Sequence, residues 1–426
     1  MSQHCASQDS WYYPKAIIIF LLMALFLCFE MALQVSPGVM AEQLRNSLHL
    51  TAFGLGIMSG VYFVTYTIMQ IPSGLMYDRT NFRVLVTVAI LICAAGIGIF
   101  GFSSGIISGS LARLLMGFGS AFAFLSVLTV AARYFPPAYF AMLTGIAQLL
   151  AAIGGIVGNI PIAWSTDQFG WRQTLWGIMV IGIFLAAIIW FFVRKPKPAP
   201  QSKEEDVEPV MCTLKRIIHQ RQTWMAALYA FFNWAPVTAF ASLWGVPFLK
   251  TAYHLSNTQS GSLCALIWLG IGVASPFVGA LSDLIGRRNP MLFSTAMVGA
   301  IAVSIVVYVP HLPIWALSLC LFITGIGPSG QILSFAVVKD FTARKRTSTS
   351  IGFNNMAVVA SGILVQPFVG KLLSLHSAMT AHVSIHHVYA IGDLKAALII
   401  LPIFFIICAI LSLGIIRETF CGRERI

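Results

Sequence analysis

Twelve long apolar runs follow one another along this chain, and they limit its fold more than any other feature. We predict helices at about 15–40, 53–72, 83–105, 107–133, 138–162, 171–193, 223–249, 258–282, 290–309, 312–338, 347–373 and 393–416. Each run is close to the roughly 20 apolar residues that cross the hydrocarbon core of a bilayer. The sequence therefore predicts an all-α membrane protein with twelve transmembrane helices.

The composition also indicates that the bilayer is the solvent of this chain. Hydrophobic residues make up 58% of the 426 residues and charged residues only 9%, and the mean hydropathy is +0.85. A soluble fold would expose far more apolar surface than water tolerates. The formal net charge of +12 would suggest nucleic acid for a soluble protein, but here the bases lie between the apolar runs. We expect the lipid bilayer as a partner and no nucleic acid.

The positions of lysine and arginine predict the orientation. If the N-terminus is cytoplasmic, most bases fall on the inner side. The outer side then keeps Arg45, Arg172, Lys250, Lys371 and Lys395. This asymmetry predicts a multi-pass protein of the inner (plasma) membrane with both termini cytoplasmic. No removable signal peptide is expected, because no small-residue cleavage site follows the first apolar run.

A short segment with an acid and bases occurs twice, as GLMYDRTNFR and as GALSDLIGRR. At one constant offset the aligned pairs are Gly74 with Gly279, Asp78 with Asp283, and Arg83 with Arg288. A repeat at equivalent depth indicates two related halves. We expect six-helix bundles over 1–193 and 223–426. The proline-rich, charged stretch at 194–222 predicts a flexible cytoplasmic linker between them.

The repeated GxxxD····R pattern resembles the cytoplasmic signature of the major facilitator superfamily, which joins the second and third helices of each half. The resemblance implies the superfamily fold, two six-helix bundles around a central cavity. It also implies gating residues at the inner helix ends, namely Gly74, Asp78, Arg83, Arg133, Gly279, Asp283, Arg287 and Arg288. The alternative is that these residues serve only to set the topology.

The two acids have a mechanical role in this architecture. Asp78 would face the start of the eleventh helix near Thr347, where unpaired N–H groups carry partial positive charge, and Arg133 would be a further charge partner. Asp283 would make the equivalent contact with the fifth helix, which is expected to begin at Pro137. We expect these contacts to close the inner side and to break when the protein opens inward.

Two charges lie deep inside apolar runs. Of the 14 acids only Glu30 does so, and of the 26 bases only Arg113. At 1.5 Å per residue, Glu30 lies roughly 22 Å from the inner face and Arg113 about 10 Å from the outer end of its helix, which are similar depths. The superfamily resemblance implies that both line the cavity as a pair, direct or bridged by water. Arg113 would hold an anionic group of a solute while Glu30 takes up a proton or meets an amino group. A structural ion pair is the alternative.

Small residues mark two helices. Gly117 and Gly119 follow the deep arginine in RLLMGFGSA and predict a thin face that a neighbouring helix can approach. This run resembles the fourth-helix pattern of the superfamily, which is associated there with proton coupling. Gly154, Gly155 and Gly158 resemble the glycine-rich fifth helix of antiporters, and close helix packing with a proline kink is the alternative.

Polar and aromatic side chains on the helices that the superfamily uses for binding are further cavity candidates. They are Gln34, Tyr62, Tyr66, Gln148, Asn233, Trp234, Trp244, Gln331, Asn354, Asn355 and Gln366. For each of them, packing or hydrogen bonding between helices is the alternative. The adjacent amides at 354 and 355 are the strongest candidates for the cavity, because placing both of them against lipid would cost free energy.

Nothing in the sequence predicts an enzyme, a cofactor or a metal site. The eight cysteines are scattered and form no CxxC, and no Walker loop, nucleophile elbow or zinc-protease helix is present. The outer loop contains His376, His382, His386 and His387. We expect it to be solvated rather than metal-binding, because no cysteine or acid completes a ligand set before Asp393.

Several runs narrow the resemblance, among them QVSPGVM, YTIMQIPSGLMYDR, RLLMGFGSAFAF and LWGVPFL. They resemble bacterial inner-membrane permeases similar to the lysosomal dipeptide carriers. The resemblance implies a monomeric secondary transporter that moves a small polar or zwitterionic solute by alternating access, a short peptide or amino acid being favoured and proton coupling left open. The alternatives are an organic-anion or siderophore permease, a drug-type exporter, and a membrane receptor or assembly protein that transports nothing.

Overall fold

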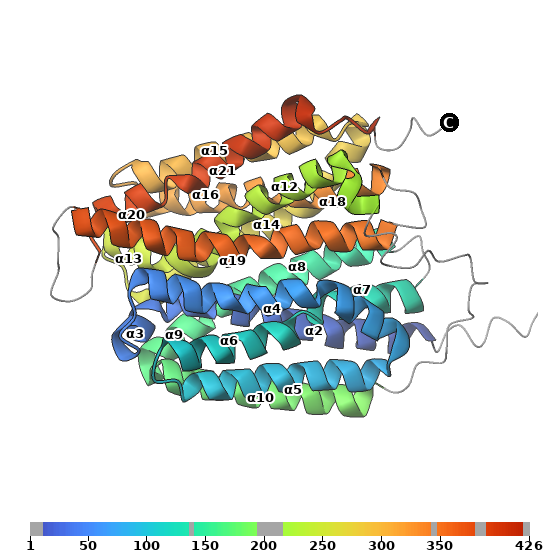
Figure 1. Cartoon of the computed structure of the whole chain (residues 1–426), viewed down its shortest axis with the longest axis horizontal. Helices are drawn as coiled ribbons and strands as arrows, with labels where there is room; N and C mark the ends of the chain where they lie inside the picture. The colour runs from blue at the N-terminus through green and yellow to red at the C-terminus, as the bar shows by residue number, and fades with distance from the viewer. Residues whose placement is uncertain (1–11, 136–139, 194–215, 342–346, 380–388, 421–426) are drawn as a thin grey trace, which may run out of the picture.

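The computed structural model describes residues 12–135, 140–193, 216–341, 347–379 and 389–420. These residues form helices joined by short connections, with no strand among them. They contain 12 helical spans long and apolar enough to cross a bilayer, which confirms the prediction from the apolar runs. Figure 1 shows these spans lying along the long axis of the molecule, with the first half of the chain (blue to green) below the second half (yellow to red).

The N-terminal half comprises the first six spans. Its helices are α2 (Tyr12–Val39), α3 (Ala41–Ser47), α4 (Ala52–Arg79), α5 (Phe82–Gly101), α6 (Ile106–Ser120), α7 (Ala123–Tyr134), α8 (Phe140–Asn159), α9 (Pro161–Phe169) and α10 (Trp171–Phe192). Helices α6 and α7 together form one span, and so do α8 and α9. The fifth span breaks at Pro161, the first residue of α9, because proline has no N–H to continue the preceding helix.

The C-terminal half comprises the other six spans. Its helices are α12 (Arg221–Pro236), the π-helical η2 (Val237–Trp244), α13 (Gly245–Tyr253), α14 (Asn257–Ile285), α15 (Asn289–Tyr308), α16 (Ile314–Thr324), α17 (Ile326–Ser329), α18 (Gln331–Phe341), α19 (Thr347–Met379), α20 (Ile391–Ala397), α21 (Ile400–Ile410) and the π-helical η4 (Leu411–Ile415). The sequence did not predict these breaks within spans, or the short helix α3. Of the predicted linker at 194–222, residues 194–215 lie outside the described part of the chain.

Glycines let the helices approach one another closely. A Cβ atom on Gly117 would lie 1.9 Å from the carbonyl oxygen of Tyr62, and one on Gly119 would lie 2.4 Å from that of Ala89. These distances confirm the predicted thin face. On α8, a Cβ atom on Gly155 would lie 2.3 Å from the Trp268 ring. The glycines of the fifth span thus have a packing role, as the alternative interpretation held.

The bundle has two ends that matter for the site. We call the end where α2 begins and where the described chain stops at Phe420 the terminal end, and the end that carries α3 the opposite end (Figure 1). Between the halves, α4 packs against α19 and α8 packs against α14. These two helix pairs set the separation of the halves around the cavity described below.

Candidate functional site

A cavity lies between the two halves near the middle of the spans. Its wall is built by α2, α4, α7 and α8 from the N-terminal half and by α12, α14, α18 and α19 from the C-terminal half. It leaves about 70 Å³ for the centres of water molecules, and one water needs roughly 10–15 Å³ by that measure. The cavity therefore has room for several waters or a small solute.

Six of the predicted cavity residues line this wall. They are Gln34, Tyr66, Gln148, Trp234, Gln331 and Asn355. No charged side chain lines it among the residues that the structure describes. The amide of Asn355 donates a hydrogen bond of 2.9 Å to Gln70 Oε1, which joins α19 to α4 on the side of the cavity nearer the terminal end.

Other predicted cavity residues lie outside the wall and hold helices together instead. The amide of Asn233 donates to the carbonyl of Gly327 at 3.0 Å, and that of Asn354 donates to the hydroxyl of Ser334 at 2.8 Å. Gln366 donates to the carbonyl of Thr238 at 2.8 Å, and Trp244 donates to the carbonyl of Gln366 at 3.3 Å. Sequence position predicts which helix a residue belongs to, but these contacts depend on rotation about the helix axis.

The two deep charges meet through a tyrosine. The hydroxyl of Tyr62 donates a hydrogen bond of 2.7 Å to Glu30 Oε1, and the guanidinium carbon of Arg113 lies 4.4 Å from the centroid of the same ring. Arg113 Nη1 also donates to the carbonyl of Leu33 at 3.1 Å. No direct ion pair joins Glu30 to Arg113 among the described residues; both side chains contact Tyr62 instead.

This Glu30–Tyr62–Arg113 cluster lies one layer behind the cavity wall. All three side chains are fully buried, and the Tyr62 ring contacts the ring of Tyr66, which lines the cavity, at a centroid distance of 5.9 Å. Glu30 Oε2 and the Nε and Nη2 atoms of Arg113 have no hydrogen-bond partner among the described residues. Buried charges with spare hydrogen-bonding capacity are costly, so a membrane protein rarely keeps them without a function.

The two halves close tightly at the opposite end. A Cβ atom on Gly38 would lie 2.8 Å from the carbonyl oxygen of Ser242, and one on Gly56 would lie 2.6 Å from that of Gln366. Polar contacts join the halves here as well, among them an ion pair between Glu42 and Lys250. The guanidinium of Arg45 stacks on the Tyr389 ring at 4.5 Å. The cavity is therefore sealed from this end.

His376 belongs to the opposite end too. Its Nδ1 lies 2.7 Å from Asp393 Oδ1, which joins α19 to α20. The histidines at 382, 386 and 387 lie outside the described residues. Within the described ranges, no group of three His, Cys, Asp or Glu side chains could hold a metal ion.

At the terminal end of the N-terminal half, the structure describes only some of the predicted gating residues. The side chain of Asp78 and those at Thr347 and Pro137 lie outside what the structure describes, so the predicted contacts of Asp78 with Thr347 and Arg133 stay predictions. Arg133 Nη2 donates to the carbonyl of Tyr77 at 2.8 Å. A Cβ atom on Gly74 would meet none of the described residues within 4 Å.

Arg83 and Gly279 also lie at the terminal end, one in each half. The guanidinium carbon of Arg83 lies 4.3 Å from the centroid of the Trp190 ring, so in this conformation Arg83 fastens α5 to α10 within its own half. A Cβ atom on Gly279, like one on Gly74, would meet no described residue within 4 Å. Within the described part of the chain, both signature glycines thus lack the close contacts that glycines make at the opposite end.

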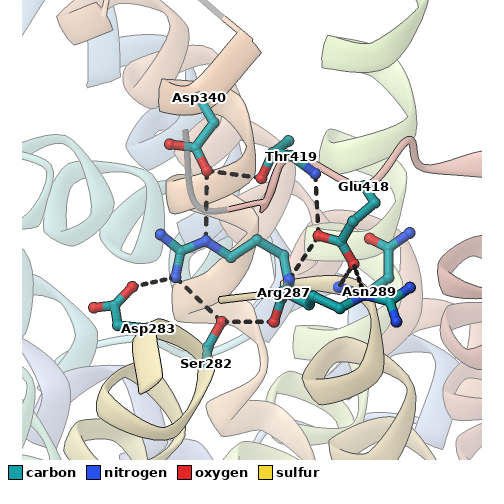
Figure 2. A network of polar contacts seen from close by, with 8 residues as sticks. Ser282, Asp283, Arg287, Asn289, Asp340, Glu418 and Thr419 are labelled. Carbon is teal, nitrogen blue, oxygen red and sulfur yellow. Dashed lines mark hydrogen bonds and ion pairs between the residues drawn. The ribbon is translucent and has the colours of Figure 1, made fainter. Parts of the chain in front are cut away.

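In the C-terminal half, Arg288 is the centre of a polar network, and Figure 2 labels its partners Asp283, Asp340 and Glu418. Its Nη1 lies 2.6 Å from Asp283 Oδ1, and its Nε lies 3.4 Å from Asp340 Oδ2. The carboxylate of Glu418 accepts hydrogen bonds from the backbone N–H groups of Arg288, at 2.7 Å, and of Asn289, at 3.0 Å. Arg287 lies 3.7 Å from the same carboxylate. The network joins α14, α15, α18 and the segment after η4.

Sequence reasoning missed the two acids Asp340 and Glu418 in this network. Both occur beside bases near the inner helix ends, next to Lys339 and Arg417, where our topology argument counted only the bases. The sequence did contain one indication of this network, namely an acid among the bases that set the topology. Such an acid predicts an ion pair with a nearby base, but the sequence does not show with which base.

Glu418→Ala should destabilise the terminal end. Its carboxylate pairs with two N–H groups at the start of α15, which would otherwise have no helical partner. We expect a loss of about 1–2 kcal/mol in the free energy of unfolding, seen as a lower melting temperature in detergent. Arg417→Ala is the matched control, because its side chain is exposed. Equal melting temperatures for the two variants would contradict the role given to Glu418.

Comparison with known proteins places these features in a family. The chain is 24% identical over 284 residues to the uncharacterized transporter YybO of Bacillus subtilis, and the match covers 62% of this chain and 65% of YybO. It is 23% identical to the hexuronate transporter of the same organism, covering 79% of this chain and 83% of that protein. It is 22% identical to the "Probable galactarate/D-glucarate transporter GudP", covering 84% and 87%.

The fold has close structural counterparts as well. The crystal structure of a bacterial homolog of the human lysosomal transporter Spinster, inward-facing and unoccupied, superimposes with a TM-score of 0.76 at 16% identity, covering 94% of this chain and 96% of that one. The family model described as Major Facilitator Superfamily matches residues 20–246 and 227–420. The chain therefore belongs to the Major Facilitator Superfamily and is a secondary transporter of that type.

Proposed function

We propose that this transporter carries small organic acids, with a proton, by alternating access. The observation that carries the proposal is the buried Glu30–Tyr62–Arg113 cluster directly behind the cavity wall. The names of the relatives with a stated substrate support it, because hexuronate and galactarate or D-glucarate are organic anions. These relatives give no support to the peptide that the sequence favoured, so we replace that preference with organic acids.

The arrangement of the halves supports a rocking mechanism. The cavity lies between two helix bundles that meet closely at the opposite end, whereas at the terminal end no described residue lies within 4 Å of a Cβ atom placed on Gly74 or Gly279. Rigid-body rocking of such halves around a fixed central site exposes the site to each side in turn. The charge asymmetry of the loops supports cytoplasmic termini, and on that assignment this conformation faces inward.

The cluster supports a role for a proton. An anion that enters a cavity with no charged side chain on its described wall needs a positive charge close by, and Arg113 is the buried cation behind Tyr62. Glu30 in the same cluster would cancel that positive charge unless it carries a proton. Protonation of Glu30 would therefore couple proton binding to anion binding.

Uptake into proteoliposomes tests this proposal. With an inward-directed proton gradient, we expect the protein to accumulate glucuronate or glucarate and not dialanine. Glu30→Gln mimics the protonated acid, so it should permit exchange of the organic acid while removing accumulation driven by the gradient. Accumulation of dialanine alone, or no uptake of either acid, would overturn the proposal. Gradient-driven accumulation by Glu30→Gln would overturn the role of Glu30.

A further inference from the structure

Three glutamine side chains face the cavity without a protein partner. Gln34 and Gln331 are only 4% and 3% exposed, and Gln148 is half-buried. All three line the cavity, yet none forms a side-chain hydrogen bond with any residue in the described part of the chain. Gln366 is equally buried but lies outside the wall and donates to the carbonyl of Thr238 at 2.8 Å.

Unpaired amides are unusual in a protein interior. Nearly all buried polar groups have a hydrogen-bond partner, because leaving one unpaired costs free energy. Helix packing pairs one N–H group of each of Asn233, Asn354 and Gln366, although their side-chain oxygens have no partner among the described residues. The cavity glutamines have neither end of the amide paired within the described residues and they line the cavity, so a partner that enters the cavity can bind them.

The three amides converge from both halves. Gln34 lies on α2 and Gln148 on α8 of the N-terminal half, whereas Gln331 begins α18 of the C-terminal half. Aromatic rings make much of the remaining wall, with Trp234 and Trp268 packed edge to face at a centroid distance of 6.2 Å. A solute in this cavity thus meets amides from both halves and apolar ring surface between them.

The chemistry of the amide selects the solute. Each carboxamide offers two N–H donors and one oxygen acceptor, whereas a carboxylate can only accept and would leave the amide oxygens unpaired. A hydroxyl group both donates and accepts, so a carbon chain with several hydroxyl groups can satisfy both ends of each amide. The C–H surface of such a chain can pack on the rings.

We propose that Gln34, Gln148 and Gln331 are specificity residues that bind the hydroxyl groups of a polyhydroxylated organic acid. The inference rests on the proposed function and adds to it which part of the acid the cavity recognises. The negative charge is compensated by the buried cluster behind Tyr62, and the amides select hydroxylated acids over plain ones.

The test compares glucarate with adipate, dicarboxylates of equal chain length that differ in their hydroxyl groups. Uptake by the full-length protein in proteoliposomes should show a clear preference for glucarate. Gln34→Met and Gln331→Met should each raise the KM for glucarate by about tenfold, the usual effect of one lost hydrogen bond. Their kcat, and the KM for adipate, should stay within about twofold, which is far smaller than that effect.

A stability measurement separates recognition from packing. Because the two amides have no protein partner, Gln34→Met and Gln331→Met should keep or raise the melting temperature of the solute-free protein. Gln366→Met is the matched control: it should lower the melting temperature and leave the preference for glucarate over adipate unchanged. A purely structural role for the cavity amides would give the same result at all three positions.

The outcomes distinguish this inference from the function on which it rests. If none of glucuronate, glucarate and adipate enters the vesicles, the proposed function fails and this inference fails with it. If both acids enter with equal KM, or if the methionine variants keep the preference, organic-acid transport stands and the assignment of the amides is overturned. A preference for glucarate that only Gln34→Met and Gln331→Met abolish confirms the assignment.

Discussion

Arg113→Ala should reduce uptake of the transported acid by about a hundredfold, because the bound anion would lose the nearby buried cation, a loss of about 2–5 kcal/mol. The guanidinium carbon lies 4.4 Å from the centroid of the Tyr62 ring, and Nη1 donates a hydrogen bond of 3.1 Å to the carbonyl of Leu33. Without this guanidinium, neither the carboxylate of Glu30 nor an anion in the cavity has the positive charge of Arg113 nearby. Initial uptake rates in proteoliposomes measure the effect.

Two variants make this test specific. Arg172→Ala removes a guanidinium with similar contacts, stacked on Trp171 at 4.2 Å and donating to the carbonyl of Ser103 at 3.0 Å, but outside the cavity. It should transport normally. Arg113→Lys keeps the charge and loses the planar stack, so it should retain part of the activity. Normal uptake by Arg113→Ala, in a protein that melts like the wild type, would show that the cluster takes no part in transport.

The sequence predicted the spans and the depth of the two charges because both depend on position along a helix. Apolar length fixes how many helices cross a bilayer, and a rise of 1.5 Å per residue places Glu30 and Arg113 at similar depth. Depth constrains the positions of these side chains strongly, because a charge deep in the bilayer has to face the interior of the bundle or a water-filled cavity. The repeat of Gly74 at Gly279 likewise indicates two related halves.

Rotation about the helix axis could not be predicted in the same way. Helices in this protein are apolar on all sides, so no polar stripe shows which face of α4 points to the cavity. Tyr62 and Tyr66, one turn apart, therefore looked equivalent, yet only Tyr66 lines the cavity and Tyr62 joins the two charges. Adjacent Asn354 and Asn355 point to Ser334 and to Gln70 for the same reason.

Contacts made by connecting segments escaped prediction for a different reason. Glu418 belongs to a short polar segment after the last span, and its partners Arg288 and Asn289 lie far away in the sequence. Charge patterns assign such residues to one side of the membrane but carry no information about which ones meet. The terminal network around Arg288 thus appears only once the helices are placed.

Gly117→Ala should strongly destabilise the protein and lower its folded yield. The added Cβ atom would lie 1.9 Å from the carbonyl oxygen of Tyr62 and 2.7 Å from the hydroxyl oxygen of Thr65. Backbone cannot rotate away as a side chain does, so α6 and α4 would have to separate. Overpacking of this kind costs about 1–3 kcal/mol and occasionally more, and we expect the upper end here.

The same clash reaches the site, because the displaced carbonyl belongs to the tyrosine between Glu30 and Arg113. Any Gly117→Ala protein that does fold should therefore transport poorly. Gly145→Ala is the control, since a Cβ atom there would meet no described residue within 4 Å and alanine favours helix. The yield of monodisperse protein in detergent and its melting temperature measure folding. If Gly117→Ala equals Gly145→Ala in both yield and melting temperature, the close packing of α6 on α4 at Gly117 does not limit folding, and the prediction is wrong.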